Sequence, residues 1–369
     1  MATDHYKTTS HSPDREGGTA ADSTGDSPSA PLSEEQSATD GEGGADTPHP
    51  AFERYAAEAV PAAAVGSAGK DGLLELRFAT DADGETALVR DLSRAPFHVS
   101  GTLGHDPHPD AETVYVQSPT GGVAQGDRRT VSVTVDEGAL AHISTGSSTK
   151  VLSMSRNYGA VDVSLSVGPD AHLDYVPAPT ILHADARYYE GRSLDVAPSG
   201  SAIVGEVVVP GRLARGERFA FERYCSRFEA CSDSALLATD AAHLAPDERD
   251  PTAAGVLGEF AVLGTLYIVA PAADAAELSD RLHDAVARGP GAETNGDSGQ
   301  VPAAGDGDDA GDGERGHVRA GATALPNDAG VVVRAVGHRA ESVTAAVRAA
   351  WDEARTALVG VGAPDPRRQ

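Results

Sequence analysis

The feature that most constrains the fold is a pattern that recurs along the middle of the chain. Residues 133–140, 165–173 and 194–203 each contain a strand, a polar turn with glycine, proline or aspartate, a small residue and a second strand. Repeated units of this kind stack into layered or coiled sheets. Ordinary hairpins of a β-sandwich would show similar turns, because few residue types form tight turns. We favour the stacked arrangement, and both alternatives predict a mainly β protein.

Short alternating runs predict further strands, and two apolar stripes predict helices. Residues 72–78 alternate between apolar and polar side chains, and Asp83-Gly84 predicts a hairpin turn after them. Apolar residues at helical spacing predict helices at 272–287 and 340–358. We therefore expect a mainly β fold of stacked or solenoid-like sheets, with about two α-helices near the C-terminus.

The balance of charges is strongly acidic and almost free of lysine. The chain has a formal charge of −27, and its 29 basic residues are arginines apart from Lys7, Lys70 and Lys150. Such a composition predicts a protein that stays soluble at very high salt and comes from a halophile, where screening limits self-repulsion. The same charge argues against nucleic acid or a membrane surface as a partner.

Two segments predict disorder because they are polar and contain few large apolar residues. Residues 1–55 predict a disordered acidic tail, and residues 288–324 predict a disordered acidic insertion in a single β-rich domain at 72–369. We find no apolar run of about 20 residues and no secretory signal, which argues against a membrane span or export. Cys225 and Cys231 are too few for a disulfide framework, so we expect a cytoplasmic protein.

A search for catalytic motifs predicts that the chain is not an enzyme. The sequence has no G-x-S-x-G elbow. The segment from Gly146 to Lys150 lacks the first glycine and the Gly-Lys pair that a phosphate-binding loop requires.

His105 and His108 lie on either side of Asp106 in a spacing that could hold nickel or zinc. Their proline-rich loop offers no rigid element, so we favour a solvated loop and assign no firm metal site.

Segments rich in glycine, proline and hydroxyl groups are candidates for contact with a partner or for a channel. Three glycines in residues 118–128 permit tight turns or close backbone approach. Asp127 can accept hydrogen bonds from turn amides. Lys150 offers a compact ammonium group, although an ordinary surface lysine explains it equally well. Structural ion pairs explain the charges of residues 205–217 as well as function does. The candidate residues are Gly121, Gly122, Asp127, Thr149, Lys150, Pro177, Glu206, Arg212 and Glu217.

These segments, in this order, resemble the UreD (or UreH) family of urease accessory proteins. The resemblance covers residues 72–368, and each motif alone is weak, whereas the order and spacing of all of them are specific. The matching stretches are PTGGVAQGDR at 119–128, STGSSTKV at 144–151, DYVPAPTILH at 174–183, GEVVVPGRLARGERFAF at 205–221, and Val333-Arg334, Trp351 and Arg355 near the end. The chain departs from the family around Ser144 and Gly146, at Pro179, and at its last three residues.

The resemblance implies a non-catalytic scaffold or chaperone in urease maturation, with stacked sheets and a pair of C-terminal helices. Members of this family bind apo-urease and the accessory protein UreF, and UreF recruits the nickel-carrying GTPase UreG. Nickel would then be a transient cargo that passes through an internal channel, GTP would bind the partner alone, and no cofactor would be held tightly. Asp127, Lys150, Glu206 and Glu217 are the hypothetical channel or interface residues.

The residues taken alone leave other classes of function open. A stand-alone β-rich module that binds metal or carbohydrate is the main alternative, although aromatic residues are scarce at 5% of the chain. A β-fold hydrolase would need a paired base and nucleophile, which the sequence does not offer.

Overall fold

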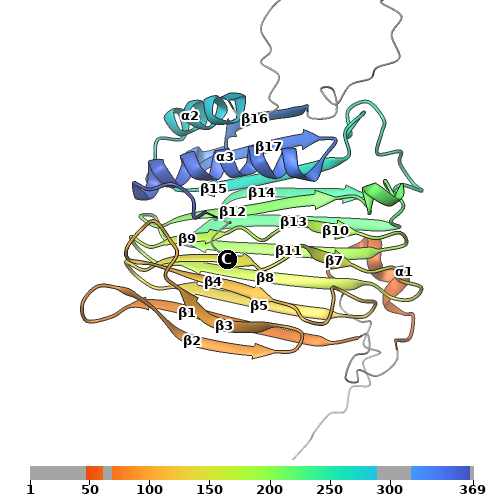
Figure 1. Ribbon diagram of the computed structural model, residues 1–369, viewed down its shortest axis with the longest axis horizontal. Coiled ribbons are helices and arrows are strands. Elements are labelled where there is room, and N and C mark those ends of the chain that lie inside the picture. Colours follow the sequence, from red (N-terminus) through yellow and green to blue (C-terminus); the bar gives the residue numbers. More distant parts are fainter. Residues whose placement is uncertain (1–46, 61–68, 289–316, 366–369) are drawn as a thin grey trace, which may run out of the picture. The chain divides into compact units, whose positions relative to one another are not determined.

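The computed structural model describes residues 47–60, 69–288 and 317–365 (Figure 1). Within these ranges the chain forms two β-sheets, named sheet A and sheet B, and the strands of the repeats alternate between them. Sheet A has the strand order β14-β13-β11-β8-β5-β1-β2. Its strands are β1 Asp71–Thr80, β2 Thr86–Arg94, β5 Arg128–Val135, β8 Gly159–Val167, β11 Arg187–Val196, β13 Arg223–Ser232 and β14 Ala235–Leu244.

Sheet B has the order β16-β17-β15-β12-β9-β6-β4-β3, with β7 and β10 paired beside β12. Its strands are β3 His98–Leu103, β4 Ala111–Gln117, β6 Leu140–Thr145, β7 Thr149–Val151, β9 His172–Tyr175, β10 Thr180–Leu182, β12 Ser201–Val209, β15 Val262–Val269, β16 Val318–Ala324 and β17 Gly330–Gly337. Strand β16 lies within the predicted insertion 288–324, so that prediction is wrong from residue 317 onward. Residues 289–316 lie outside the described ranges.

The predicted stacking of the repeats is confirmed by the pairing register. Strands β5, β8 and β11 are parallel in sheet A, and Val133, Leu165 and Leu194, which begin the three repeats, pair in one row. Each turn then leads into a parallel strand of sheet B, β6, β9 or β12. The two strands of a repeat therefore lie in different sheets, which makes a stacked coil and excludes hairpins within one sheet.

The core between the sheets follows from period-two alternation. The predicted hairpin is confirmed as the antiparallel pair β1–β2, and Leu74, Leu76 and Phe78 of β1 are buried in the core. Valine, leucine and alanine supply most of the remaining core side chains, as expected for a chain with few aromatic residues. Burial of this apolar surface is the main stabilising contribution to the coil.

Two helices cover the outer face of sheet B at its β15–β17 end (Figure 1). They are α2 Ala275–Arg288 and α3 Ala340–Val359, which confirms the predicted pair near the C-terminus. A side chain at Gly264 of β15 would lie 2.7 Å from methyl groups of Val343 and Val347, so glycine allows α3 to approach the sheet closely. Within the described ranges, every helix is too short or too polar to cross a membrane.

The end of the predicted N-terminal tail is ordered, which corrects its boundary. Residues 47–60, hereafter the strap, contain a 3₁₀ turn at Pro50–Phe52 and the short helix α1 Glu53–Ala56. Phe52 and Tyr55 are buried in a cluster with Tyr158, which directly precedes β8, and Tyr189 of β11. These two aromatic side chains lie three residues apart and therefore face the same side of a helical turn. Residues 1–46 lie outside the described ranges.

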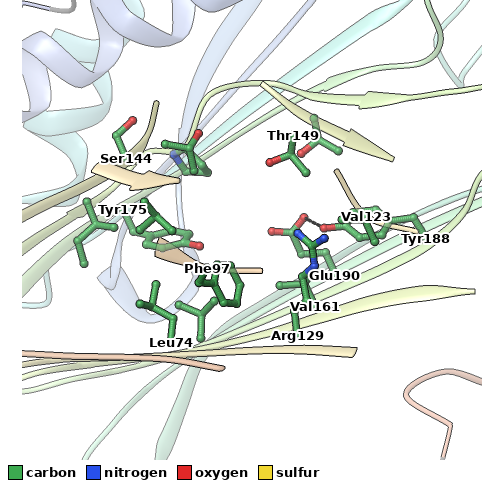
Figure 2. Close-up of a pocket in the computed structure, with 16 residues that line it drawn as sticks. Leu74, Phe97, Val123, Arg129, Ser144, Thr149, Val161, Tyr175, Tyr188 and Glu190 are labelled. Atoms are coloured by element: carbon green, nitrogen blue, oxygen red, sulfur yellow. Dashed lines mark hydrogen bonds between the residues drawn. The ribbon is translucent and has the colours of Figure 1, made fainter. Parts of the chain in front are cut away.

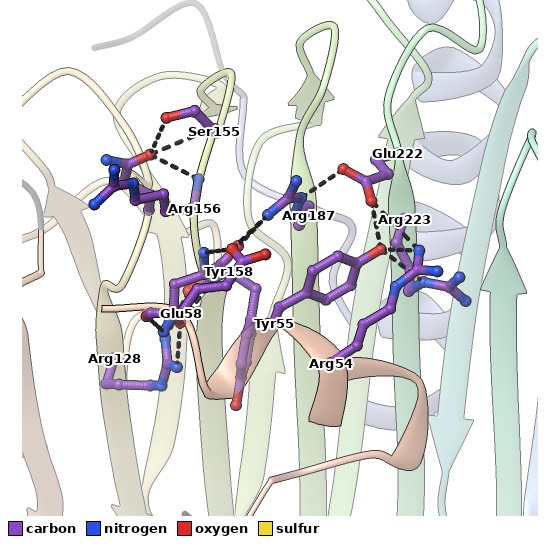
Figure 3. Close-up of polar contacts among 12 residues, drawn as sticks. Arg54, Tyr55, Glu58, Arg128, Ser155, Arg156, Tyr158, Arg187, Glu222 and Arg223 are labelled. Carbon is purple, nitrogen blue, oxygen red and sulfur yellow. Dashed lines mark hydrogen bonds and ion pairs between the residues drawn. The ribbon is translucent and has the colours of Figure 1, made fainter. Parts of the chain in front are cut away.

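Polar contacts fix the strap beside its aromatic anchors (Figure 3). The Arg187 guanidinium of β11 pairs with Glu58 of the strap at 3.0 Å and also with Glu222. The Tyr55 hydroxyl donates to Glu222 at 2.7 Å, and the backbone amide of Asn157 donates to Glu58 at 2.6 Å. The strap is thus held to three successive coils by apolar and ionic contacts together.

Candidate functional site: the cavity between the sheets

A cavity of about 70 Å³ lies between the two sheets (Figure 2). It can hold a few water molecules. Leu74, Val131 and Val161 line it from sheet A, while Ile143 and Tyr175 line it from sheet B. Its polar lining comes from Arg129, Ser144, Thr145, Thr149, Thr180, Tyr188 and Glu190.

A buried group of charged and hydroxyl side chains, hereafter the polar core, extends from this cavity. Arg192 of β11 pairs with Glu190 at 2.7 Å and with Glu206 of β12 at 2.9 Å. The Tyr188 hydroxyl donates to Glu190 at 2.9 Å, and the Tyr224 hydroxyl donates to Glu206. All five side chains are buried. Alternation along β11 directs Tyr188, Glu190 and Arg192 to the interior face, and β12 and β13 bring their partners.

Burial controls the protonation of the polar core. Burial raises the pKa of Glu190, and the neighbouring Arg192 partly opposes this rise. Burial and the adjacent carboxylates also raise the pKa values of Tyr188 and Tyr224 well above their ordinary value, so both stay protonated as donors. Burial alone would lower the pKa of Arg192, but Glu190 and Glu206 raise it well above the ordinary value. One guanidinium therefore faces two carboxyl groups in an enclosed space.

A second pocket, of about 110 Å³, adjoins the cavity on the side toward the surface, and we call the two together the route. It shares Phe97, Arg129 and Thr149 with the lining of the cavity. Exposed residues at its outer end include Gly121 and Lys150. Ser118, Ser147 and Ser148 add hydroxyl groups to its lining, so polar groups follow the route from the surface to the cavity.

The candidate Asp127 lies beside this route as a structural clamp. Its carboxylate accepts hydrogen bonds from the backbone amides of Lys70 at 2.9 Å and Ala124 at 3.0 Å, which confirms the predicted bonds to turn amides. It also pairs with Arg129 at 3.1 Å, and both side chains are nearly fully buried. These donors already occupy the carboxylate, so Asp127 holds the loop in shape.

The other glycine and hydroxyl candidates meet at the outer end of the route. At Gly122 a Cβ would collide with the Lys150 carbonyl oxygen, which is the close backbone approach predicted for this segment. Gly121 lies beside it with open space around it. Thr149 and Pro177 line the cavity itself, and the exposed Lys150 lies at the surface.

Arg212 and Glu217 form an ion pair on the loop after β12 and do not line the cavity. A hydrogen bond from Arg212 lowers the pKa of Glu217. Glu206 is thus the single predicted carboxylate that reaches the polar core. Arg212 lines another pocket, outside the coil, and Lys150 belongs to the lining of that pocket as well.

The histidine-rich loop is not solvated throughout. The Asp106 side chain is fully buried and pairs with Arg355 of α3 at 2.9 Å, so the prediction of a solvated loop is wrong at this residue. Among the described residues, no group of three or more His, Cys, Asp or Glu side chains is placed to hold a metal ion, and His105 and His108 gain no such partners.

Sequence reasoning missed Tyr188, Glu190, Arg192 and Tyr224. A signal was present, because the repeat aligns Glu190 with Val161 and Arg192 with Val163. Charged residues at positions where the neighbouring coil carries buried valines indicate a polar core.

The described part of the chain therefore defines a coiled two-sheet scaffold with an apolar interior, a buried polar core and two covering helices. Residues 70–369 match the sequence model of a family described as "UreD urease accessory protein". A urease accessory protein UreD of Haloarcula marismortui is 58% identical over 324 residues, which is 88% of this chain and 99% of the relative. The UreD of Natronomonas pharaonis is 43% identical over 318 residues, 86% of this chain and 98% of the relative. That of Haloquadratum walsbyi is 37% identical over 315 residues, 85% of this chain and 95% of the relative.

The chain belongs to the UreD family, as the resemblance predicted. The similarity to these halophilic archaea agrees with the halophilic origin predicted from its acidic, lysine-poor composition. Family membership supports a role in urease maturation and takes away the support for a stand-alone binding module.

Proposed function

We propose that this chain is a non-catalytic maturation factor of the cytoplasm that binds apo-urease and UreF, and through UreF the GTPase UreG. In this role it assists the GTP-dependent insertion of nickel into urease. Nickel is a transient cargo that moves along the interior of the coil. GTP binds the partner, and the chain itself holds no cofactor tightly.

The polar core is the observation that carries the channel part of this proposal. Carboxylate and hydroxyl oxygens suit brief contacts with a borderline cation such as Ni²⁺, whereas thiolates would hold it more tightly. Glu190 lines the cavity, and Arg192 joins it to Glu206 at 2.9 Å. Because two carboxylates face one guanidinium, a cation that passes nearby meets a net negative charge in a medium of low dielectric constant.

The sharpest test replaces Glu190 with glutamine. Glu190→Gln keeps the shape of the side chain, and Arg192 keeps Glu206 as its counterion, so the polar core becomes neutral without leaving a charge unpaired. Urease is matured at molar KCl with apo-urease, UreF, UreG, GTP and nickel, and bound nickel and urease activity are measured. We expect Glu190→Gln to co-purify with UreF and apo-urease as the unmodified chain does and to deliver less nickel.

Glu75→Gln is the matched control, because Glu75 of β1 forms a partly exposed ion pair with Arg90 of β2. It should mature urease normally. Normal maturation by Glu190→Gln would exclude the polar core as the route for nickel. Failure of the unmodified chain to co-purify with both UreF and apo-urease would refute the scaffold role itself.

A further inference from the structure

A third, larger pocket outside the coil has a charge opposite to that of the whole chain. It has a volume of about 640 Å³ and lies where β7, β10, the loop after β12 and the start of α3 meet. We call it the basic pocket. Its lining contains the cations Lys150, Arg212, Arg215 and Arg339, the histidines His183 and His338, and the single carboxylate Glu341.

Two of these cations are not neutralised within the described part of the chain. Lys150 and Arg215 are exposed and have no ion pair there. Arg212 is paired with Glu217, and Arg339 lies 3.8 Å from the exposed carboxylate of Glu341. Of the two histidines in the pocket, His183 responds to this charge. Burial, together with Arg212, Lys150 and Arg215, lowers the pKa of His183. In a chain with a formal charge of −27, such a concentration of unpaired cations is an exception.

The backbone that carries the cations is fixed before any partner arrives. At Gly211, where φ is +138°, a Cβ would collide with the Glu217 carbonyl oxygen, so this tight loop requires glycine. The loop is closed by a hydrogen bond of 2.7 Å from the Phe219 amide to the Pro210 carbonyl oxygen. Rigid placement reduces the entropy that binding costs.

Helix α3 adds to the positive potential of the basic pocket. Arg339, Ala340 and Glu341 at its first turn belong to the lining. The N-cap residue Arg339 provides no side-chain hydrogen bond to the helix. The first amides of a helix and its dipole favour an anion at this end.

Apolar side chains complete the lining and define the shape of the ligand. Ile181, Val209 and Leu213 lie among the cations. At molar salt the screening length is about 3 Å, so attraction acts through direct contact rather than over distance. A ligand that suits these conditions carries carboxylates for the arginines and apolar side chains for the surface between them.

We propose that the basic pocket binds an acidic, partly apolar peptide segment of a partner protein. Carboxylates of that segment contact Arg215 and Arg339, and its apolar side chains pack on Ile181 and Leu213. The inference goes beyond the proposed function and does not depend on the channel, because no residue of the polar core takes part.

The test uses the full chain in molar KCl and a short fluorescein-labelled peptide of alternating glutamate and leucine. Binding is followed by fluorescence anisotropy, and the same peptide with glutamine in place of glutamate is the probe control. The double variant Arg215→Ser/Arg339→Ser removes two cations from the basic pocket. Arg90→Ser/Arg94→Ser removes two exposed cations from β2, the edge strand of sheet A, which does not line the basic pocket, and is the matched control.

We expect the glutamate peptide to bind the unmodified chain and the β2 variant equally well. Loss of two charge-assisted contacts should weaken binding to the pocket variant by about tenfold or more. The glutamine peptide should bind weakly to all three chains. Equal binding of the glutamate peptide to all three chains, or no binding to any, would overturn the proposal.

Two further measurements separate other occupants of the basic pocket. If inorganic phosphate displaces the peptide at equal concentration, the pocket is a site for small anions and the proposal of a peptide partner fails. If a chain without residues 1–46 binds the peptide at least about tenfold more tightly, the acidic N-terminal residues of the chain itself occupy the pocket. That result would overturn the assignment to a partner.

Discussion

The indole nitrogen of Trp351 donates a hydrogen bond of 2.7 Å to the carboxylate of Asp174, across 177 positions of sequence. One turn further along α3, Arg355 pairs with the same carboxylate at 3.0 Å and with Asp106 at 2.9 Å. The carboxylates and the guanidinium are at most 1% exposed. Helix α3 is therefore joined to β9 and to the loop before β4 by charges that have no access to water.

Removal of the Arg355 guanidinium should destabilise the protein strongly. Arg355→Met keeps the length of the side chain but leaves Asp106 and Asp174 buried without their cation, so we expect the free energy of unfolding to fall by about 3–5 kcal/mol. Urea denaturation at molar KCl measures the change. Arg281→Met is the control, because it breaks the partly exposed pair between Arg281 of α2 and Glu353 of α3 and should cost less than about 1 kcal/mol. Similar losses in both variants would contradict this account.

The same region predicts how stability depends on pH. His142 lies against Trp351, with ring centroids 5.2 Å apart, and burial lowers its pKa to about 4, against the opposing effect of Asp174 and Asp106. Between that value and the ordinary 6.5, the unfolded chain binds a proton that the folded chain does not. Stability should therefore decrease as the pH falls through this window, by up to about 3 kcal/mol.

The variant His142→Gln tests this pH dependence directly. It should show a smaller change in the free energy of unfolding between these two pH values, as measured by urea denaturation in buffers of constant salt. His283→Gln replaces an exposed histidine of α2 and should leave the dependence unchanged. An unchanged dependence in His142→Gln would assign the effect to other groups.

The stacked coils could be predicted because their cause is local. Val133, Leu165 and Leu194 start units with the same alternation and the same turn chemistry, and the structure places them in one row. The two helices were predictable for the same reason. The stripe expected at 340–358 corresponds to α3 at Ala340–Val359.

The polar core could not be predicted in full, because its stability depends on residues that are distant in sequence. Glu190 and Arg192 interrupt the apolar positions of β11, which is visible in the sequence. Their partners Glu206 and Tyr224 come from other strands, and no spacing rule connects the three strands.

The strap was missed for a related reason. Phe52 and Tyr55 lie next to a long polar segment. When composition is averaged over that segment, two aromatic residues do not change the prediction of disorder.

Loss of the Phe52 ring should release the strap and expose Cys225. The thiol is 2% exposed in the cluster with Phe52, and burial raises its pKa to about 12, so it should react slowly in the unmodified chain. In a Cys231→Ser background, Phe52→Ala should increase the rate of thiol alkylation by roughly a hundredfold, because the truncation costs about 3 kcal/mol or more of strap binding.

Glu53→Ala is the control for the strap, since Glu53 is exposed within the same short helix. It should leave the alkylation rate of Cys225 close to that of the parent chain. A Phe52→Ala variant that also reacts at the parental rate would mean that sheet A protects the thiol without the strap.

Gly121 and Gly122 provide a matched pair that separates backbone strain from collision. Both have positive φ, +86° and +139°, but a Cβ has open space at Gly121 and collides with the Lys150 carbonyl oxygen at Gly122. That oxygen accepts a hydrogen bond of 2.7 Å from Val123, so the loop cannot move away without losing it. In urea denaturation we expect Gly121→Ala to cost about 1 kcal/mol and Gly122→Ala at least about 3 kcal/mol. Equal costs would show that β7 can move away from the loop, because strain alone would then account for both.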